Sequence, residues 1–204
     1  MKRTLYLLIL SDIFILSGFG LISPILAIFI NTDLIGGSIL AAGIAISIFW
    51  TIKSLLQLPL SMYIDTKRKK KGFLILGTCI ISIVPFIYFF SKSVFHIYLA
   101  QTLYAMGAAL AYPTWLSLFT INVDKKHRGF EWSVWSTCVG LGVGLSAFIG
   151  GNLTELIGFR NVALITGVLA IIGFSILFFI GKNNQDKINP NIMINQRRMK
   201  HLKK

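Results

Sequence analysis

The stretch "LSDIFILSGFGLISPILAIFI", Leu10 to Ile30, is almost wholly apolar. It is long enough for a helix to cross the hydrocarbon core of a bilayer, which takes roughly 20 apolar residues. Yet it holds a carboxylate, Asp12, and two residue types that weaken helices, among them Gly18 and Pro24. A charge within a membrane span is costly, so it indicates a functional site by default.

The composition extends this reading to the whole chain of 204 residues. Hydrophobic residues make up 55%, charged residues 13%, and the mean hydropathy is +0.75, whereas a soluble domain has about 25% charged residues. The first apolar run is too long for a signal peptide and lacks a small-residue cleavage site, so it is expected to remain as a helix. No segment has the alternating pattern of a membrane barrel. We predict an all-α integral membrane protein with six transmembrane helices at about 4–30, 38–63, 72–91, 94–121, 130–156 and 159–181.

The net charge of +13 raises nucleic-acid binding as one interpretation, but the placement of the charges favours a membrane. Apart from Lys53, Lys92 and Arg160, all lysines and arginines lie at the N-terminus, in alternate loops or in the tail 182–204. The positive-inside rule explains this pattern and predicts that both termini are cytoplasmic. We therefore expect a multi-pass cell-membrane protein, with a six-helix bundle at 1–181 and a basic cytoplasmic tail held at the anionic inner leaflet, and no nucleic-acid partner.

Two spans share a pattern that indicates an internal repeat. Five residues separate Gly18 from Pro24 in the first span and Gly107 from Pro113 in the fourth. Proline bends a helix and glycine allows another helix to come close, so these four residues are assigned to helix bending and packing. A polar residue stands twelve positions before each proline, and Asn-x-Asp follows each span: Asp12 and Gln101, then Asn31 and Asn122.

The matching segments predict an inverted 3+3 repeat, with one copy at about 4–91 and the other at about 94–181. The first and fourth spans run in opposite directions, as the copies of many secondary transporters do. In such proteins the substrate site lies near the bilayer midplane, where the repeats meet.

Polar residues within the spans are the candidate site. Asp12 lies roughly 12 Å from the cytoplasmic edge at about 1.5 Å per residue. Burial at this depth disfavours an ionised carboxylate and suits Asp12 to proton or cation coupling. The alternative is that its side chain makes a structural hydrogen bond between helices. Trp50, Lys53 and Gln57 share one helix face and should line a cavity, with Lys53 near enough in depth to pair with Asp12 or attract an anion. Gln101, Tyr104 and Tyr112 share a face of the fourth span and are added to the cavity.

The fifth span, "GLGVGLSAFIGG", carries two ladders of small residues, one of which includes Gly142 and Gly150 and the other Gly151. Such spacing predicts close helix packing. Cys79 and Cys138 lie within spans and are expected to serve packing alone. No grouping of nucleophile and base, no metal cluster and no phosphate loop is found, so neither an enzyme, a metal site nor a cofactor is expected.

The loop "SMYIDTKRKKKGFLILG" after the second span carries a family resemblance. Asp65 matches the signature aspartate of the major facilitator superfamily there, followed by basic residues at Lys67, Lys69 and Lys70. The whole chain resembles one six-helix half of that superfamily. The resemblance implies that these four residues form a cytoplasmic gate, in which Asp65 lies near Phe130 or Trp132 at the start of the fifth helix of the opposite half.

The first span is similar to the first helix of drug:proton antiporters, whose embedded acid and first proline correspond to Asp12 and Pro24. Ala27 stands in place of their second proline, and Leu103 in place of an arginine in the fourth helix. Gly142, Gly150 and Gly151 match the antiporter signature of the fifth helix, where Ser146-Ala147 replaces Gly-Pro.

Superfamily members have two such halves, so we expect a parallel homodimer in which each copy supplies one half. The expected function is secondary active transport by alternating access, with proton-coupled export of a small amphipathic or cationic solute and Asp12 carrying the proton. Alternatives are an importer of a sugar or anionic solute, a non-transporting scaffold, and one half of a hetero-pair.

Overall fold

The computed structural model describes residues 2–67 and 70–181 of the chain. Six of its helices are long and apolar enough to cross a membrane, which confirms the predicted number of spans. Lys69 and the tail 182–204 lie outside the described residues. The elements are α1 (Arg3–Ile22), α2 (Leu26–Asp33), α3 (Ile39–Asp65), α4 (Lys71–Phe90), α5 (Val94–Asn122), α6 (Arg128–Ile157), α7 (Phe159–Ile176) and the short 3₁₀ helix η1 (Leu177–Phe179).

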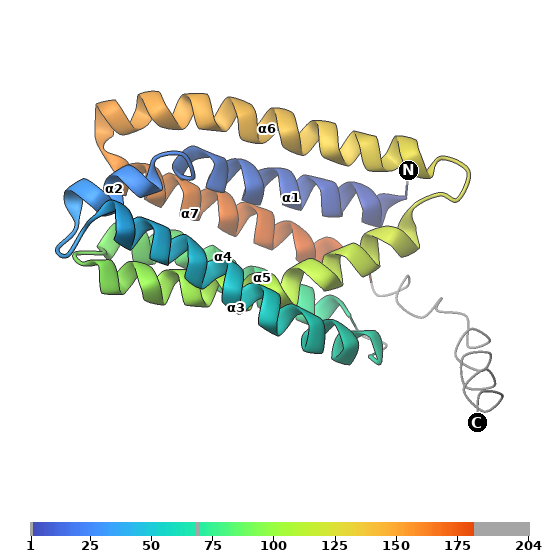
Figure 1. The fold of residues 1–204 in the computed structure, drawn as a ribbon. Helices are drawn as coiled ribbons and strands as arrows, with labels where there is room; N and C mark the ends of the chain where they lie inside the picture. Colours follow the sequence, from blue (N-terminus) through green and yellow to red (C-terminus); the bar gives the residue numbers. More distant parts are fainter. Residues whose placement is uncertain (1, 68–69, 182–204) are drawn as a thin grey trace.

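The long helices lie side by side in one elongated bundle (Figure 1). α1 packs chiefly against α6 and α7, whereas α5 packs chiefly against α3 and α4. α4 and α7 pack against each other. α5 in the second half of the chain therefore has neighbours equivalent to those of α1 in the first half, with α3 and α6 each on the outside of the arrangement.

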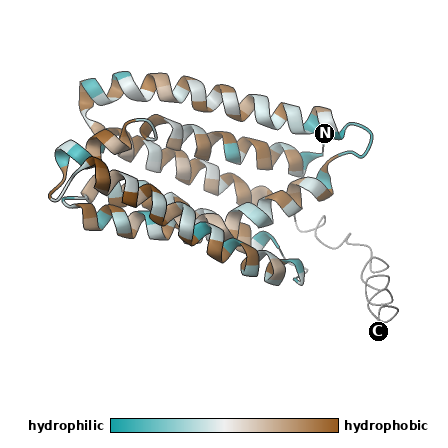
Figure 2. Ribbon diagram, viewed as in Figure 1, coloured by the Kyte–Doolittle hydropathy of each residue, from teal (hydrophilic) through white to brown (hydrophobic). Residues whose placement is uncertain are grey.

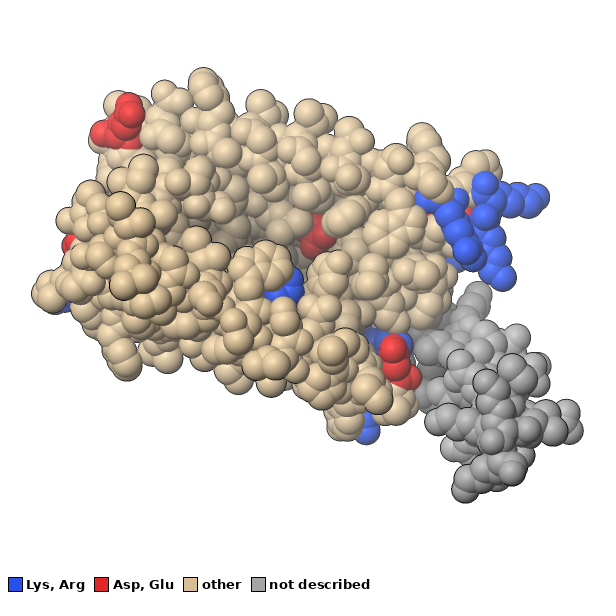
Figure 3. Space-filling view, viewed as in Figure 1, with Lys and Arg blue, Asp and Glu red and all other residues tan. Residues whose placement is uncertain are grey.

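The two ends of the bundle differ in charge. The N-terminus, the α3–α4 connection and the α5–α6 connection lie together at one end, called here the inner end for the orientation that the charges predict (Figure 1). Lysines and arginines gather there (Figure 3). Residues of the helices between the ends are mostly hydrophobic or near neutral, while hydrophilic residues concentrate at the connections (Figure 2), and many large hydrophobic side chains are exposed. This distribution suits a bundle whose middle is surrounded by lipid.

The first span is broken at Ser23–Ile25 between α1 and α2, where a single helix over 4–30 is predicted from the sequence. Pro24 has no N–H to continue the helical hydrogen bonds, which explains the break. Pro113, its counterpart in the sequence pattern, lies inside α5, and that helix continues through it to Asn122. The same Gly-x₅-Pro pattern thus gives an interruption in one span and a continuous helix in the other.

Glycines set the distance between helices. A β-carbon on Gly77 of α4 would lie 2.6 Å from the carbonyl oxygen of Gly107 in α5, so both residues must be small for this pair to pack as it does. Gly150 of α6 lies directly against the carbonyl of Leu21, and Gly142 lies against the hydroxyl of Ser17. Two of the predicted packing glycines in α6 therefore face α1 within the same bundle.

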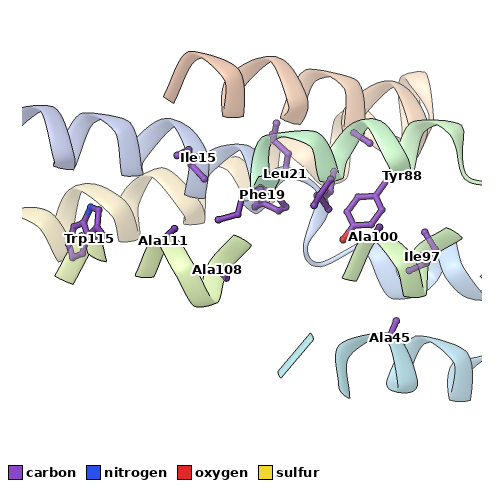
Figure 4. Packing of buried hydrophobic residues seen from close by; sticks show 14 of the residues in the cluster. Ile15, Phe19, Leu21, Ala45, Tyr88, Ile97, Ala100, Ala108, Ala111 and Trp115 are labelled. Carbon is purple, nitrogen blue, oxygen red and sulfur yellow. The ribbon is translucent and has the colours of Figure 1, made fainter. Parts of the chain in front are cut away.

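Gly18 holds α1 against α7. Its carbonyl oxygen accepts a 2.9 Å hydrogen bond from the Thr166 hydroxyl, and a β-carbon there would lie 3.2 Å from that of Leu169. Near Gly18 on α1, the buried Ile15 and Phe19 share the hydrophobic core with Ala108 and Ala111 of α5 (Figure 4). The small alanines let α5 approach α1 and leave room for pockets beside them.

Candidate functional site

Asp12 and Lys53 line one pocket of about 310 Å³. α1 supplies Asp12, α3 supplies Lys53, and α5 supplies Tyr104 and Tyr112. Red acidic and blue basic atoms are visible on this face between the two ends (Figure 3). The remaining lining is mainly apolar and aromatic, as in sites that enclose small molecules. We call this space the inner pocket.

The carboxylate of Asp12 has a specific partner on α6. The indole Nε1 of Trp135 donates a 2.8 Å hydrogen bond to its Oδ2 atom. A hydrogen bond to a charged group is among the stronger ones in proteins and fixes the direction of the carboxylate. Trp135 was not predicted from the sequence, because only the packing of α6 on α1 brings it to Asp12.

The ammonium group of Lys53 lies among aromatic rings. Its Nζ atom is 4.7 Å from the ring centre of Trp50, 5.1 Å from that of Tyr112 and 5.6 Å from that of Phe49. These distances suit cation–π attraction, which holds a cation over the face of a ring. Within the described residues, no ion pair joins Lys53 to Asp12, although both face the inner pocket.

Tyr104 separates the inner pocket from a second one. Its ring stacks on Phe19 at a centre-to-centre distance of 4.7 Å and lies 4.6 Å from the ring of Phe49. Phe49 and Tyr104 line both pockets. The aromatic group of Phe19, Tyr104 and Phe49 therefore stands between two spaces where the sequence predicts a single cavity.

The second space, called here the outer pocket, measures about 290 Å³ and contains the other predicted cavity residues, Trp50 and Gln101. It lies beside the break between α1 and α2 and is lined on other sides by residues of α3, α4 and α5. Gln57 lines neither pocket and is half-buried one helical turn closer to the inner end than Lys53. Five of the six proposed cavity residues are thus divided between two pockets.

At the inner end, Asp65 lies 2.6 Å from the Nζ atom of Lys70 in the same chain. Lys70 also donates a 2.8 Å hydrogen bond to the Ser117 hydroxyl on α5, so the pair ties the α3–α4 connection to α5. Lys67 lies over the ring of Tyr63 instead, 4.3 Å from its centre. Phe130, one of the two residues expected near Asp65 of a second copy, is exposed, whereas Trp132 packs against Phe119 at 4.4 Å.

The comparisons with known proteins agree with this architecture. The Major Facilitator Superfamily profile matches residues 8–200. An uncharacterised MFS-type transporter of Methanocaldococcus jannaschii is 23% identical over 194 residues, which cover 93% of this chain and 50% of that protein. The staphylopine export protein of Staphylococcus aureus is 31% identical over 85 residues, 42% of this chain and 21% of that protein.

A bundle of six spans with pockets between its helices is the architecture of a membrane transporter half. The chain belongs to the Major Facilitator Superfamily, a family of multi-pass membrane transporters rather than enzymes. It spans about half the length of the curated relative that it matches almost throughout.

Proposed function

We propose that this chain acts as one six-helix half of a secondary active transporter and exports a small amphipathic or cationic solute in exchange for protons. The observation that carries the proposal is the position of Asp12, a carboxylate at mid-span that lines a pocket of suitable size. A carboxylate kept in such surroundings can attract a cation and exchange it for a proton. The similarity to an export protein supports export as the direction.

The aromatic surroundings suit an amphipathic cation. Tyr104, Tyr112, Trp115 and Trp135 line the inner pocket together with Asp12. Aromatic faces attract organic cations and bury their apolar parts at the same time. The substrate's positive end would meet Asp12, and its body would lie on these rings.

A second copy would supply the other half of the pathway. α6 supports this because, of its residues, Glu131 and Gly150 alone are buried in the described bundle. Its exposed side carries Ser133, Thr137, Gly140 and Gly144, which share one helix face. Small residues on an exposed membrane-helix face favour close contact with another helix. Alternating access would then follow from rocking of the two bundles.

The test uses proteoliposomes with an imposed pH gradient and tetraphenylphosphonium as the amphipathic cation. We expect gradient-driven accumulation by the wild type and its loss in Asp12→Asn. Asp33→Asn is the matched control, because Asp33 is an exposed carboxylate at the outer end and should leave transport unchanged. Equal accumulation by wild type and Asp12→Asn would refute proton coupling through Asp12.

Import of an anionic solute is the second candidate, since Lys53 presents an ammonium group to the inner pocket. In this case Lys53→Gln, rather than Asp12→Asn, would abolish transport. Counterflow of 3-phenylpropionate by the wild type that is lost in Lys53→Gln would favour this candidate, because the loss would assign the exchange to the inner pocket.

A further inference from the structure

The outer pocket has an apolar lining with a polar edge. Phe19, Phe49, Trp50, Tyr88 and Tyr104 provide aromatic surface, and none of the described residues that line the pocket carries a charge. The polar edge is formed at the helix break by Ser23 and the first residues of α2, with Gln101 on α5. This edge is rich in hydrogen-bond donors.

Three backbone N–H groups at the break have no acceptor among the described residues. The nearest backbone hydrogen bonds run from Ser23 N to Phe19 O, from Ile25 N to Ile22 O and from Phe29 N to Ile25 O. Among the described residues, the N–H groups of Leu26, Ala27 and Ile28 therefore have no backbone partner. The first N–H groups of a helix point back along its axis, here toward the break, and carry the positive end of the helix dipole.

Gln101 is the second, independent sign of a ligand. Only 4% of its surface is exposed, and it makes no side-chain hydrogen bond to any described residue. It is nevertheless part of the pocket lining, so its amide faces the cavity. The amide is open to the pocket rather than sealed in the core, so its hydrogen-bonding groups are available to a molecule that enters the pocket. A ligand in the pocket would provide a partner for them.

We propose that the outer pocket binds the carboxylate group of an amphipathic organic acid. The carboxylate oxygens accept hydrogen bonds from the N–H groups of Leu26 and Ala27 and from the side-chain amide of Gln101. The helix N-terminus favours the negative charge, as it does in transporters whose broken helices point at a substrate carboxylate. The apolar part of the acid lies against Phe49, Trp50 and the neighbouring rings. This site is separate from Asp12 and does not depend on proton coupling there.

The chain offers a direct way to remove one backbone donor. Replacing Ala27 by proline deletes its N–H, and proline is tolerated in the first turn of a helix because that N–H makes no bond within the helix. Ala27→Val is the matched control, since it adds bulk at the same position but retains the N–H. Gln101→Leu removes the side-chain amide, and Gln101→Glu places a negative charge against the ligand.

The experiment measures binding to purified protein in lipid nanodiscs by titration calorimetry, without any gradient. The probes are 3-phenylpropionate and its neutral amide, 3-phenylpropanamide. We expect wild type and Ala27→Val to bind the acid about tenfold more tightly than the amide, which is the factor that one charge-assisted hydrogen bond provides. Ala27→Pro and Gln101→Leu should each lose about tenfold in affinity for the acid, and Gln101→Glu should lose more.

Equal affinity for acid and amide in both of the pairs tested would overturn the inference, and so would binding by Ala27→Pro as tight as by Ala27→Val. Decanoate and decanamide form a second pair of acid and amide. Preference for decanoate would indicate a fatty acid taken up out of the lipid phase, and preference for 3-phenylpropionate would indicate a soluble aromatic acid. Preference for the acid in either pair supports the inference, and preference in neither refutes it. Because no transport is measured, these results stand apart from those for Asp12 in proteoliposomes. Thermal unfolding identifies any variant that fails to fold, and Gln101→Glu then still tests the site.

Discussion

The indole Nε1 of Trp135 donates a hydrogen bond of 2.8 Å to Oδ2 of Asp12 and so joins α6 to the acid of α1 across 123 positions of sequence. The same tryptophan packs against Trp115, with ring centres 5.0 Å apart, and against Trp132 at 5.7 Å. Asp12 is therefore connected to an aromatic group near the inner end of the bundle. A change at the carboxylate would therefore act directly on α6, the helix that is proposed to contact a second copy.

Trp135→Phe should show how much this hydrogen bond contributes. Phenylalanine keeps much of the ring packing but removes the donor, so the free energy of unfolding should fall by about 1.5–3 kcal/mol, the range for a hydrogen bond to a charged group. The same substitution should cost clearly less in Asp12→Asn, where the partner is neutral. Unfolding in detergent, followed for all four members of the cycle, gives both values. Equal costs in the two backgrounds would show that Trp135 acts by packing alone.

Asp65 and Lys70 should respond unequally to substitution. The side chain of Lys70 is 7% exposed and that of Asp65 is 69% exposed. Asp65→Ala leaves a buried ammonium group whose remaining hydrogen bond, of 2.8 Å, goes to the Ser117 hydroxyl, whereas Lys70→Met leaves a carboxylate in water. We expect Asp65→Ala to be the more destabilising by about 1 kcal/mol, a modest value because water screens the exposed partner. Unfolding midpoints of the two variants provide the measurement.

Asp33→Ala serves as the control for that pair, because it removes an exposed carboxylate at the other end of the bundle. It should change the midpoint little. Greater destabilisation by Lys70→Met than by Asp65→Ala would contradict the importance of the buried ammonium group.

The number of spans was predictable because the bilayer sets a minimum apolar length, and the composition of each segment shows it. The interruption of the first span was not predictable as a break. Pro24 ends α1, but Pro113, in the same local pattern, lies inside a continuous α5. Local sequence indicates where a helix is weakened, while the packing of the surrounding helices decides whether it continues.

The residues that line the two pockets of the candidate site were predictable in part. Asp12 and Lys53 were identified because charges within spans are rare, and Gln101 because it repeats the spacing of Asp12 from a proline. These residues are divided between two pockets by Tyr104. The helix periodicity predicts only that Tyr104 and Gln101 line the same cavity. Only the position of Phe19 and Phe49 on two other helices shows that Tyr104 separates the pockets.

Gly150 and Gly144 of α6 should differ sharply in their tolerance of alanine. A β-carbon on Gly150 would overlap the backbone of Leu21, whereas one on Gly144 would have nothing within 4 Å. Gly150→Ala should therefore destabilise the bundle by about 1–3 kcal/mol, the usual cost of overpacking. Gly144→Ala should be neutral or slightly stabilising within one bundle, since alanine favours helix over glycine. Thermal unfolding of the monomer in detergent compares them, and similar losses would refute the assignment of the two faces.

Cysteine crosslinking tests the proposed pairing of two copies at the inner end. Phe130 at the start of α6 is 69% exposed, and Asp65 ends α3 at the same end of the bundle. If the end of α3 in one copy meets the start of α6 in the other, Asp65→Cys and Phe130→Cys on separate copies should form a disulfide, which requires Cα atoms within about 7 Å. The background carries Cys79→Ser and Cys138→Ser, and non-reducing electrophoresis of oxidised membranes reports the product.

Leu156→Cys replaces Phe130→Cys as the control, because Leu156 is exposed at the far end of α6. Crosslinking with Leu156→Cys as efficient as with Phe130→Cys, or none with either, would contradict a parallel pair joined through α3 and α6.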